Sequence, residues 1–188
     1  MDRIVGIDIS LTSTGLAVIT RRTDGTTLAT TATFTSRGHR NDGLTERASR
    51  ITTLAADIDR AAGPCVLALV EGPMIAVKGG SPVDRHHLWW AVVEHLLARG
   101  VPVAVVISTT LKRAIAGKGN ADKGAVASAV TRLWADVELA NADEGDALGL
   151  AHLGAVALGW PVQTLERHRE SLSVIRWPAG LTVGESVA

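Results

Sequence analysis

Two nearly continuous apolar runs, at residues 65–71 and 101–107, most constrain what this chain can fold into. Runs of this kind are typical of strands that are covered on both faces of a sheet. Three further strand patterns, joined by short connections that favour an antiparallel meander, precede them at residues 3–9, 14–20 and 26–35. Helical periodicity lies between and after the strands. The sequence therefore predicts an α/β fold in which a five-stranded mixed sheet, three antiparallel strands and then parallel ones, is flanked by helices.

The expected helices cover residues 44–62, 85–99, 122–135 and 142–160, with a short one after residue 110. A length of 188 residues favours one domain, which we expect over residues 1–160. Residues 161–188 are less regular and are predicted to form a C-terminal extension of unknown role.

Composition excludes several classes of protein. The net charge is zero, so any nucleic-acid surface must be a local patch. The single cysteine, Cys65, excludes an internal disulfide framework and a Cys₄ zinc site. The N-terminus does not read as a signal peptide, and no apolar run approaches the ~20 residues that span a bilayer. We therefore expect a cytoplasmic protein without a membrane partner.

Four carboxylates are candidates for a functional site, and two of them lie in apolar strand patterns, where acids are unusual. Asp8 lies on the first apolar strand, Glu71 ends the fourth, and Asp143 and Asp146 fall in NADEGDAL. An ionised carboxylate in a buried strand loses its hydration and needs a partner. A divalent ion is such a partner, and oxygen ligands suit Mg²⁺ or Mn²⁺. Acids from three distant segments thus indicate metal-assisted chemistry on phosphate esters.

Local patterns place these acids near one another. Ligands of such sheets favour the carboxyl ends of strands, where Asp8 and Glu71 lie. Asn141 is a good N-cap with Glu144 three residues on, so Asp143 and Asp146 share one face of a helix start. The alternative for that pair alone is that both simply favour a helix N-terminus.

Four segments carry a resemblance to a known family: GIDISLTSTGLAV (6–18), LALVEGP (67–73), LKRAIAGKGNADK (111–123) and NADEGDALGLAHLG (141–154). In these the chain resembles the RuvC-like Holliday junction resolvases, of the ribonuclease H-like (retroviral integrase) superfamily. The resemblance implies that Asp8, Glu71, Asp143 and Asp146 are catalytic and bind two Mg²⁺ ions, for which Mn²⁺ can substitute. It also implies a homodimer that resolves Holliday junctions by paired phosphodiester hydrolysis in DNA recombination and repair. Some members carry histidine where this chain has Asp143.

Basic residues near these motifs are candidates for contacting DNA. Three of the four lysines lie at positions 112, 118 and 123. We predict that Lys118 is catalytic and touches the scissile phosphate, and that Lys112 and Lys123 hold flanking phosphates. Arg37, His39, Arg40, Arg85 and His86 could extend this patch. The alternative is a solvated, lysine-rich loop.

The loop after Glu71 differs from the family pattern. Many members carry an aromatic residue there, whereas this chain has GPMIAVKGG. We assign Met74, as an apolar wedge, and Lys78 to DNA binding, although Met74 is equally explained as core. The missing aromatic residue makes a general branched-DNA nuclease, acting on flaps and forks, a plausible alternative to a strict resolvase.

The helix at 85–99 is expected to build the dimer. Trp89 and Trp90 point about 100° apart, so one should enter the core and the other should meet a partner. Together with Val93 they are our candidates for the dimer interface.

Two further readings remain. The first motif also resembles the phosphate loop of actin-like ATPases and sugar kinases, but the chain is short and lacks their second glycine-rich motif. A non-catalytic DNA-binding relative is disfavoured, because surplus buried acids cost stability without a metal.

Overall fold

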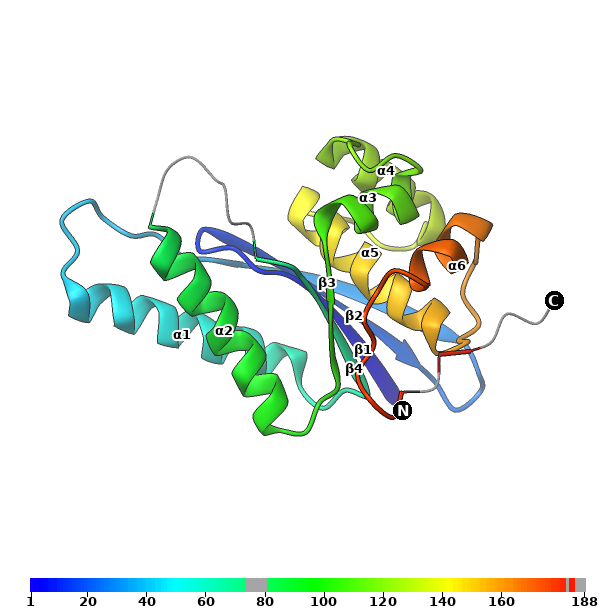
Figure 1. The fold of residues 1–188 in the computed structure, drawn as a ribbon, viewed down its shortest axis with the longest axis horizontal. Helices are drawn as coiled ribbons and strands as arrows, with labels where there is room; N and C mark the ends of the chain where they lie inside the picture. The colour runs from blue at the N-terminus through cyan, green and yellow to red at the C-terminus, as the bar shows by residue number, and fades with distance from the viewer. Residues whose placement is uncertain (74–80, 182, 185–188) are drawn as a thin grey trace.

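The computed structural model describes residues 1–73, 81–181, 183 and 184 (Figure 1). A five-stranded sheet of order β3-β2-β1-β4-β5 lies at its centre. The strands are β1 (Asp2–Asp8), β2 (Ser13–Arg21), β3 (Thr27–Thr35), β4 (Leu67–Glu71) and β5 (Val103–Val106). β1, β2 and β3 pair antiparallel, whereas β4 runs parallel to both β1 and β5. The predicted mixed sheet is thereby confirmed.

Helices cover both faces of this sheet. α1 (Leu44–Ala62) and α2 (Pro82–Ala98) lie on one face, and α3 (Ser108–Ala116), α4 (Lys123–Leu133), α5 (Ala142–Ala157) and α6 (Glu166–Leu172) lie on the other (Figure 1). Each layer has its own apolar core. Ile4 packs in the core under α5, whereas Val5 packs in the core under α1 and α2. Successive side chains of a strand point to opposite faces, so a strand feeding two cores must be apolar throughout.

α5 lies unusually close to the sheet. A Cβ atom placed on Gly6 of β1 would overlap the carbonyl oxygen of Ala147, and one on Gly15 of β2 would overlap that of Asp143. Only glycine permits a helix backbone to approach a strand this closely. The first turn of α5 is therefore seated directly against β1 and β2, at the end of the sheet where Asp8 lies.

The segment after α5 contains a helix that the sequence pattern did not predict. The sequence of α6, ERHRESL, has no helical repeat of apolar residues, yet the helix packs on α3. Arg167 donates from Nε to the carbonyl oxygen of Ala114 (2.9 Å) and from Nη2 to that of Ile115 (3.1 Å). The ring nitrogens His152 Nε2 and His168 Nδ1 lie 3.2 Å apart and join α6 to α5. Tertiary contacts, rather than amphipathicity, hold this short helix.

None of the helices in the described ranges combines the length and the apolar character needed to cross a bilayer.

Candidate active site

Three buried carboxylates converge at one end of the sheet. Asp8 ends β1 and Glu71 ends β4, and these strands are parallel neighbours with Ile7 opposite Val70. Asp146 reaches the same point from the first turns of α5. One oxygen from each of the three carboxylates lies within 4.8 Å of the other two, and all three residues are buried. The structure therefore brings together acids that are 63 and 75 positions apart in the sequence.

Hydrogen bonds fix the start of α5 against β3. The side chain of Asn141 accepts from the backbone N–H of Glu144 (3.1 Å), as expected for an N-cap. The carboxylate of Glu144 accepts from Thr31 Oγ1 (2.8 Å), Thr33 Oγ1 (2.7 Å) and the backbone N–H of Ala140 (2.9 Å). Burial alone would raise the pKa of Glu144, but these donors lower it below its usual value. Glu144 is thus an ionised anchor that positions its neighbours Asp143 and Asp146.

Crowding of negative charge shifts the acids toward their neutral forms. Burial, followed by the negative charge of Glu71, raises the pKa of Asp8 from 3.8 to about 8. The same two causes raise the pKa of Asp146 from 3.8 to about 6. Asp146 Oδ1 is buried and has no hydrogen-bond partner within the described chain. Such a cluster needs either protons or a cation, because buried carboxylates repel one another and have lost their water.

Lys123 supplies one positive charge to the cluster. Its Nζ lies 2.6 Å from Asp143 Oδ1, 3.7 Å from Asp8 Oδ2 and 3.8 Å from Asp146 Oδ2. Burial would lower the pKa of Lys123, but the hydrogen bond to Asp143 and the nearby acids raise it above its usual value. Asp143 also accepts from Ser13 Oγ (2.5 Å). Burial would raise the pKa of Asp143, and these two donors lower it. These two donors therefore favour the ionised form of Asp143.

The acids line a cavity of about 280 Å³. Its wall also contains Lys112 and Ser108 on α3 and Arg85, His86 and Trp89 on α2. The charge of Lys112 lowers the pKa of Asp146 against the opposing effects of burial and Glu71. The indole N–H of Trp89 donates to the carbonyl oxygen of Glu71 (2.8 Å) and so fixes the end of β4. The cavity thus combines a carboxylate floor with basic side chains around it.

Comparison with known proteins agrees with this geometry. The family model described as "Crossover junction endodeoxyribonuclease RuvC" matches residues 4–153. This chain belongs to the RuvC family. The RuvC protein of Cupriavidus taiwanensis is 32% identical over 149 residues, which cover 79% of this chain and 81% of that relative. The protein is accordingly a member of a family of endodeoxyribonucleases.

Solved RuvC structures share the fold. The Thermus thermophilus RuvC structure superposes with a TM-score of 0.62 at 24% identity, covering 84% of this chain and 97% of that one. Thermus thermophilus RuvC in complex with a Holliday junction substrate gives a TM-score of 0.58 at 20% identity, covering 80% and 90%. At these identities the likeness establishes the ribonuclease H-like architecture of this RuvC family member.

The predicted DNA-binding lysines are placed differently from one another. Lys112 and Lys123 line the carboxylate cavity, and Lys123 pairs with the acids although its side chain stays 55% exposed. Lys118 is exposed on the loop between α3 and α4 and is not among the residues lining that cavity. Met74 and Lys78 lie outside the described residues. Geometry therefore favours Lys112 and Lys123 over Lys118 as the lysines nearest the acids of this RuvC protein.

Burial separates the three residues predicted at the dimer interface. Trp89 is only 7% exposed and Val93 only 4%, so both belong to the core beneath α2. Trp90 is 54% exposed and its ring makes an edge-on contact with that of Trp89. Trp89 and Val93 offer almost no surface to a partner chain. Of the three residues predicted at the dimer interface, only Trp90 is accessible to one.

Sequence reasoning missed Ser13 and the structural role of Trp89. A serine beside a turn carries no distinguishing pattern, and its contact with Asp143 joins residues 130 positions apart. The indole donor of Trp89 acts on a backbone oxygen, which no side-chain motif reveals. Both supporting contacts in this RuvC family member depend on tertiary placement.

Proposed function

We propose that this protein is a metal-dependent resolvase that cuts four-way DNA junctions as a homodimer, by paired hydrolysis of two opposed strands. One observation carries the proposal: in a chain of the RuvC family, Asp8, Glu71 and Asp146 present oxygens within 4.8 Å of one another from three rigid elements. The Thermus thermophilus RuvC bound to a Holliday junction supports the choice of substrate. Bacterial relatives such as that of Cupriavidus taiwanensis support a site of action in the bacterial cytoplasm.

The donor set fits Mg²⁺. All candidate ligands are carboxylate oxygens, which hard divalent cations prefer. Asp146 Oδ1 is buried without a hydrogen-bond partner among the described residues, and the pKa of Asp8 is raised, so a bound divalent cation would relieve both. Asp8, Glu71 and Asp146 would hold one ion, and Asp143 would help to hold a second, with Mn²⁺ able to substitute. When bound, such ions activate a water molecule and stabilise the leaving oxygen of a phosphodiester.

The basic side chains of the cavity act on the DNA. Lys123 Nζ lies 2.6 Å from Asp143 Oδ1 and balances part of the negative charge of the acids. From this position its ammonium would also stabilise the charge that builds up on a scissile phosphate in the cavity. Lys112, on α3, also lines the cavity and would attract the same phosphate. These two lysines, instead of Lys118, are the proposed transition-state cations.

Exposed apolar residues on α2 support the homodimer. Val83, Trp90 and Leu97 are 72%, 54% and 53% exposed, and they recur at intervals of seven along the helix. Residues seven apart lie on one stripe of a helix, the spacing used where two helices pair. A two-fold pair of chains would present two carboxylate cavities to a two-fold junction. Replacing Trp90 by Glu should yield a folded monomer in sedimentation analysis, whereas an unchanged oligomeric state would refute this interface.

The decisive experiment is nicking of a labelled mobile four-way junction beside a flap, a fork and a linear duplex. Each substrate would be incubated with Mg²⁺, Mn²⁺ or Ca²⁺, with Asp8→Asn as the control. We expect paired symmetric nicks in the junction with Mg²⁺ and Mn²⁺, and binding without cleavage in Ca²⁺. Asp8→Asn should retain junction binding and lose nicking. Metal-independent nicking, or nicking by Asp8→Asn, would refute the proposed metal site.

A general branched-DNA nuclease is the second candidate. The stretch after Glu71 carries no aromatic residue that could stack in an opened junction. Equal rates on flaps, forks and four-way junctions in the experiment above would favour this broader specificity with the same metal chemistry.

A further inference from the structure

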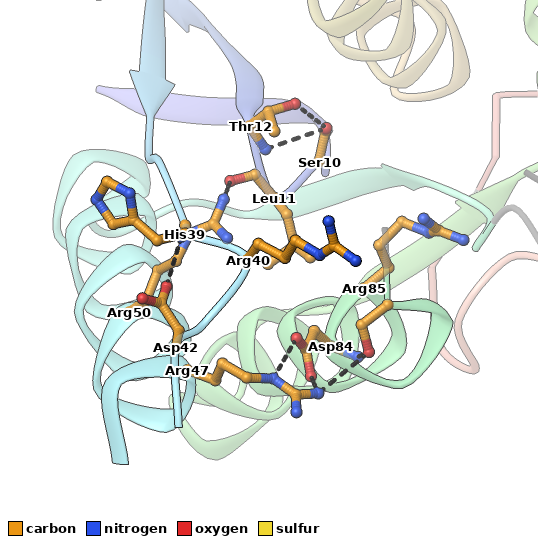
Figure 2. A pocket seen from close by; sticks show the side chains of 12 residues that line it. Ser10, Leu11, Thr12, His39, Arg40, Asp42, Arg47, Arg50, Asp84 and Arg85 are labelled. Carbon is orange, nitrogen blue, oxygen red and sulfur yellow. Dashed lines mark hydrogen bonds and ion pairs between the residues drawn. The ribbon is translucent and has the colours of Figure 1, made fainter. Parts of the chain in front are cut away.

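A second and larger hollow adjoins the carboxylate cavity. It measures about 840 Å³ and lies between the turn after β1, the loop before α1 and the first turns of α1 and α2 (Figure 2). Ser10 and Arg85 line both hollows, so the two are continuous. We call it the arginine pocket after four of its lining residues: Arg40, Arg47, Arg50 and Arg85. Two aspartates also line it, so positive charge exceeds negative charge.

Arg47 is committed to an ion pair. Its Nε and Nη2 lie 2.9 Å and 2.6 Å from the two oxygens of Asp84, and Nη2 also donates to Ser81 Oγ (3.2 Å). This two-pronged pair ties α1 to the start of α2. It neutralises the charge of Arg47 and fixes the floor of the pocket, so other arginines must provide any attraction for an anion.

Arg50 contributes a positive charge that forms no direct ion pair with a described carboxylate, although Asp84 balances part of it through space. Its guanidinium donates to the carbonyl oxygens of Leu11 (2.8 Å) and Ser36 (3.1 Å) and to Ser36 Oγ (2.9 Å). All three acceptors are uncharged. The hydrogen bonds therefore hold the side chain in place while its charge remains available to the pocket. Fixed charges in a concave wall focus the field on a bound anion.

Arg40 is the exposed partner of this fixed charge. It is exposed, extends from the loop before α1 toward the α2 side of the hollow, and has no hydrogen bond or ion pair with the described residues (Figure 2). Asp42 braces the loop by accepting from the backbone N–H of His39 (2.7 Å). A guanidinium presented in this way suits a phosphate, whose oxygens accept its fork of donors.

We infer that the arginine pocket binds a backbone phosphate of the same DNA strand that is cut in the adjoining carboxylate cavity. A strand carries one phosphate per about 3.4 Å of helix axis, so a strand that runs from one hollow into the other places phosphates in both. Contacts of this kind position DNA without reading its sequence. The inference rests on the proposed nuclease function and adds to it the path that the strand takes beyond the site.

Binding in Ca²⁺, where no cleavage is expected, tests this inference. The affinity of wild type, Arg40→Gln and Arg22→Gln for a labelled four-way junction would be measured by fluorescence anisotropy over a range of salt concentrations. Arg22 is the matched control, because it is exposed and follows β2 at the opposite end of the sheet from Asp8. Arg40→Gln should bind about tenfold more weakly and lower the salt slope by about one. Arg22→Gln should match wild type.

Neutral phosphate substitutions identify the contacted position. Single methylphosphonates would be placed at each of the first few phosphates on either side of the mapped cleavage site. At one position on the cleaved strand, the methylphosphonate should weaken binding by wild type but not by Arg40→Gln. Arg40→Gln has already lost the guanidinium that would contact this phosphate, so removing the phosphate charge costs it nothing more. A series in which every position weakens both proteins equally would refute the contact.

The remaining outcomes separate this inference from the proposed function. If wild type nicks the junction but Arg40→Gln has the affinity and salt slope of wild type, the phosphate contact in the arginine pocket is refuted and the proposed function stands. Wild type that neither binds nor nicks overturns both. If calorimetry shows inorganic phosphate binding that Arg40→Gln abolishes while junction binding is unaltered, the pocket serves a free anion and the inference is wrong.

Discussion

Replacing Asp8 by Asn should stabilise the metal-free protein, and the gain should grow as the pH rises. Burial and the charge of Glu71 raise the pKa of the folded Asp8 carboxyl to about 8, whereas the ordinary pKa of an aspartate is 3.8. Between these two values the folded protein keeps a proton that the unfolded chain releases. A group with a raised folded pKa therefore contributes stability that is complete below the unfolded pKa and is lost as the pH rises through the folded pKa. Asparagine carries no such proton in either state.

The size of the effect follows from the pKa difference. Each pH unit between the two values is worth about 1.4 kcal/mol, so the advantage of Asp8→Asn should increase by about 3 kcal/mol between pH 5 and pH 7. Burial lowers the pKa of His152 to about 3 and that of His168 to about 4, which destabilises the protein as the pH falls. The two histidines make that opposing contribution in both proteins, so the difference between the proteins reports the titration of Asp8 and of the acids coupled to it.

Urea unfolding followed by tryptophan fluorescence, in the presence of a chelator, measures this difference at several pH values. Asp136→Asn, at an exposed position, is the control. Its free energy of unfolding should change with pH in the same way as that of wild type. Added Mg²⁺ should flatten the pH dependence of wild type but not that of Asp8→Asn, because the cation replaces the proton on the cluster. A difference between Asp8→Asn and wild type that is constant from pH 5 to pH 7 would refute the proposed crowding of the acids.

Three further substitutions test other parts of the site. Lys123→Gln should slow junction nicking about a hundredfold or more, because one transition-state cation is lost, while junction binding in Ca²⁺ changes far less; a rate equal to wild type would exclude this role. Glu144→Gln should lower the free energy of unfolding by about 1–3 kcal/mol in urea titrations, because Thr31, Thr33 and a backbone N–H lose a charged acceptor; an unchanged midpoint would contradict its role as anchor. Gly15→Ala should abolish nicking by pushing the first turn of α5 off the sheet, and an active variant would show that this close contact is dispensable.

Periodicity predicted most of the fold because each element obeys a local rule. The helix expected at 44–62 coincides with α1, and the apolar run at 65–71 contains β4. The buried acids were also recognisable, since carboxylates within apolar strands conflict with burial unless they have a partner. The roles assigned to them in metal binding stay predictions.

The orientation of the lysines was not predictable from spacing. Gly117 ends α3 in the left-handed conformation, with φ at 82°, and Lys118 follows on an exposed loop. The side chain of Asp122 then caps α4 by accepting from the backbone N–H of Ala125 (2.7 Å). That cap makes Lys123 the first residue of α4 and brings it beside the acids. An Asp before a helix pattern is a recognisable N-cap. The position of Lys123 at the start of α4 could therefore have been predicted from Asp122, although the spacing of the lysines did not indicate it.

The site divides its charges between rigid and adjustable elements. Asp8, Glu71 and Asp146 stand on two paired strands and on a helix that glycines seat against the sheet, so their separation is fixed by the fold. Two of the positive charges stand on less constrained positions: Lys123 at the start of α4, and Arg40 on the loop before α1. A cation site needs a fixed geometry, whereas a branched DNA strand approaches with variable bends that long, flexible side chains can follow. Substitutions of the acids should therefore abolish cleavage outright, and those of Arg40 should alter which DNA shapes are held.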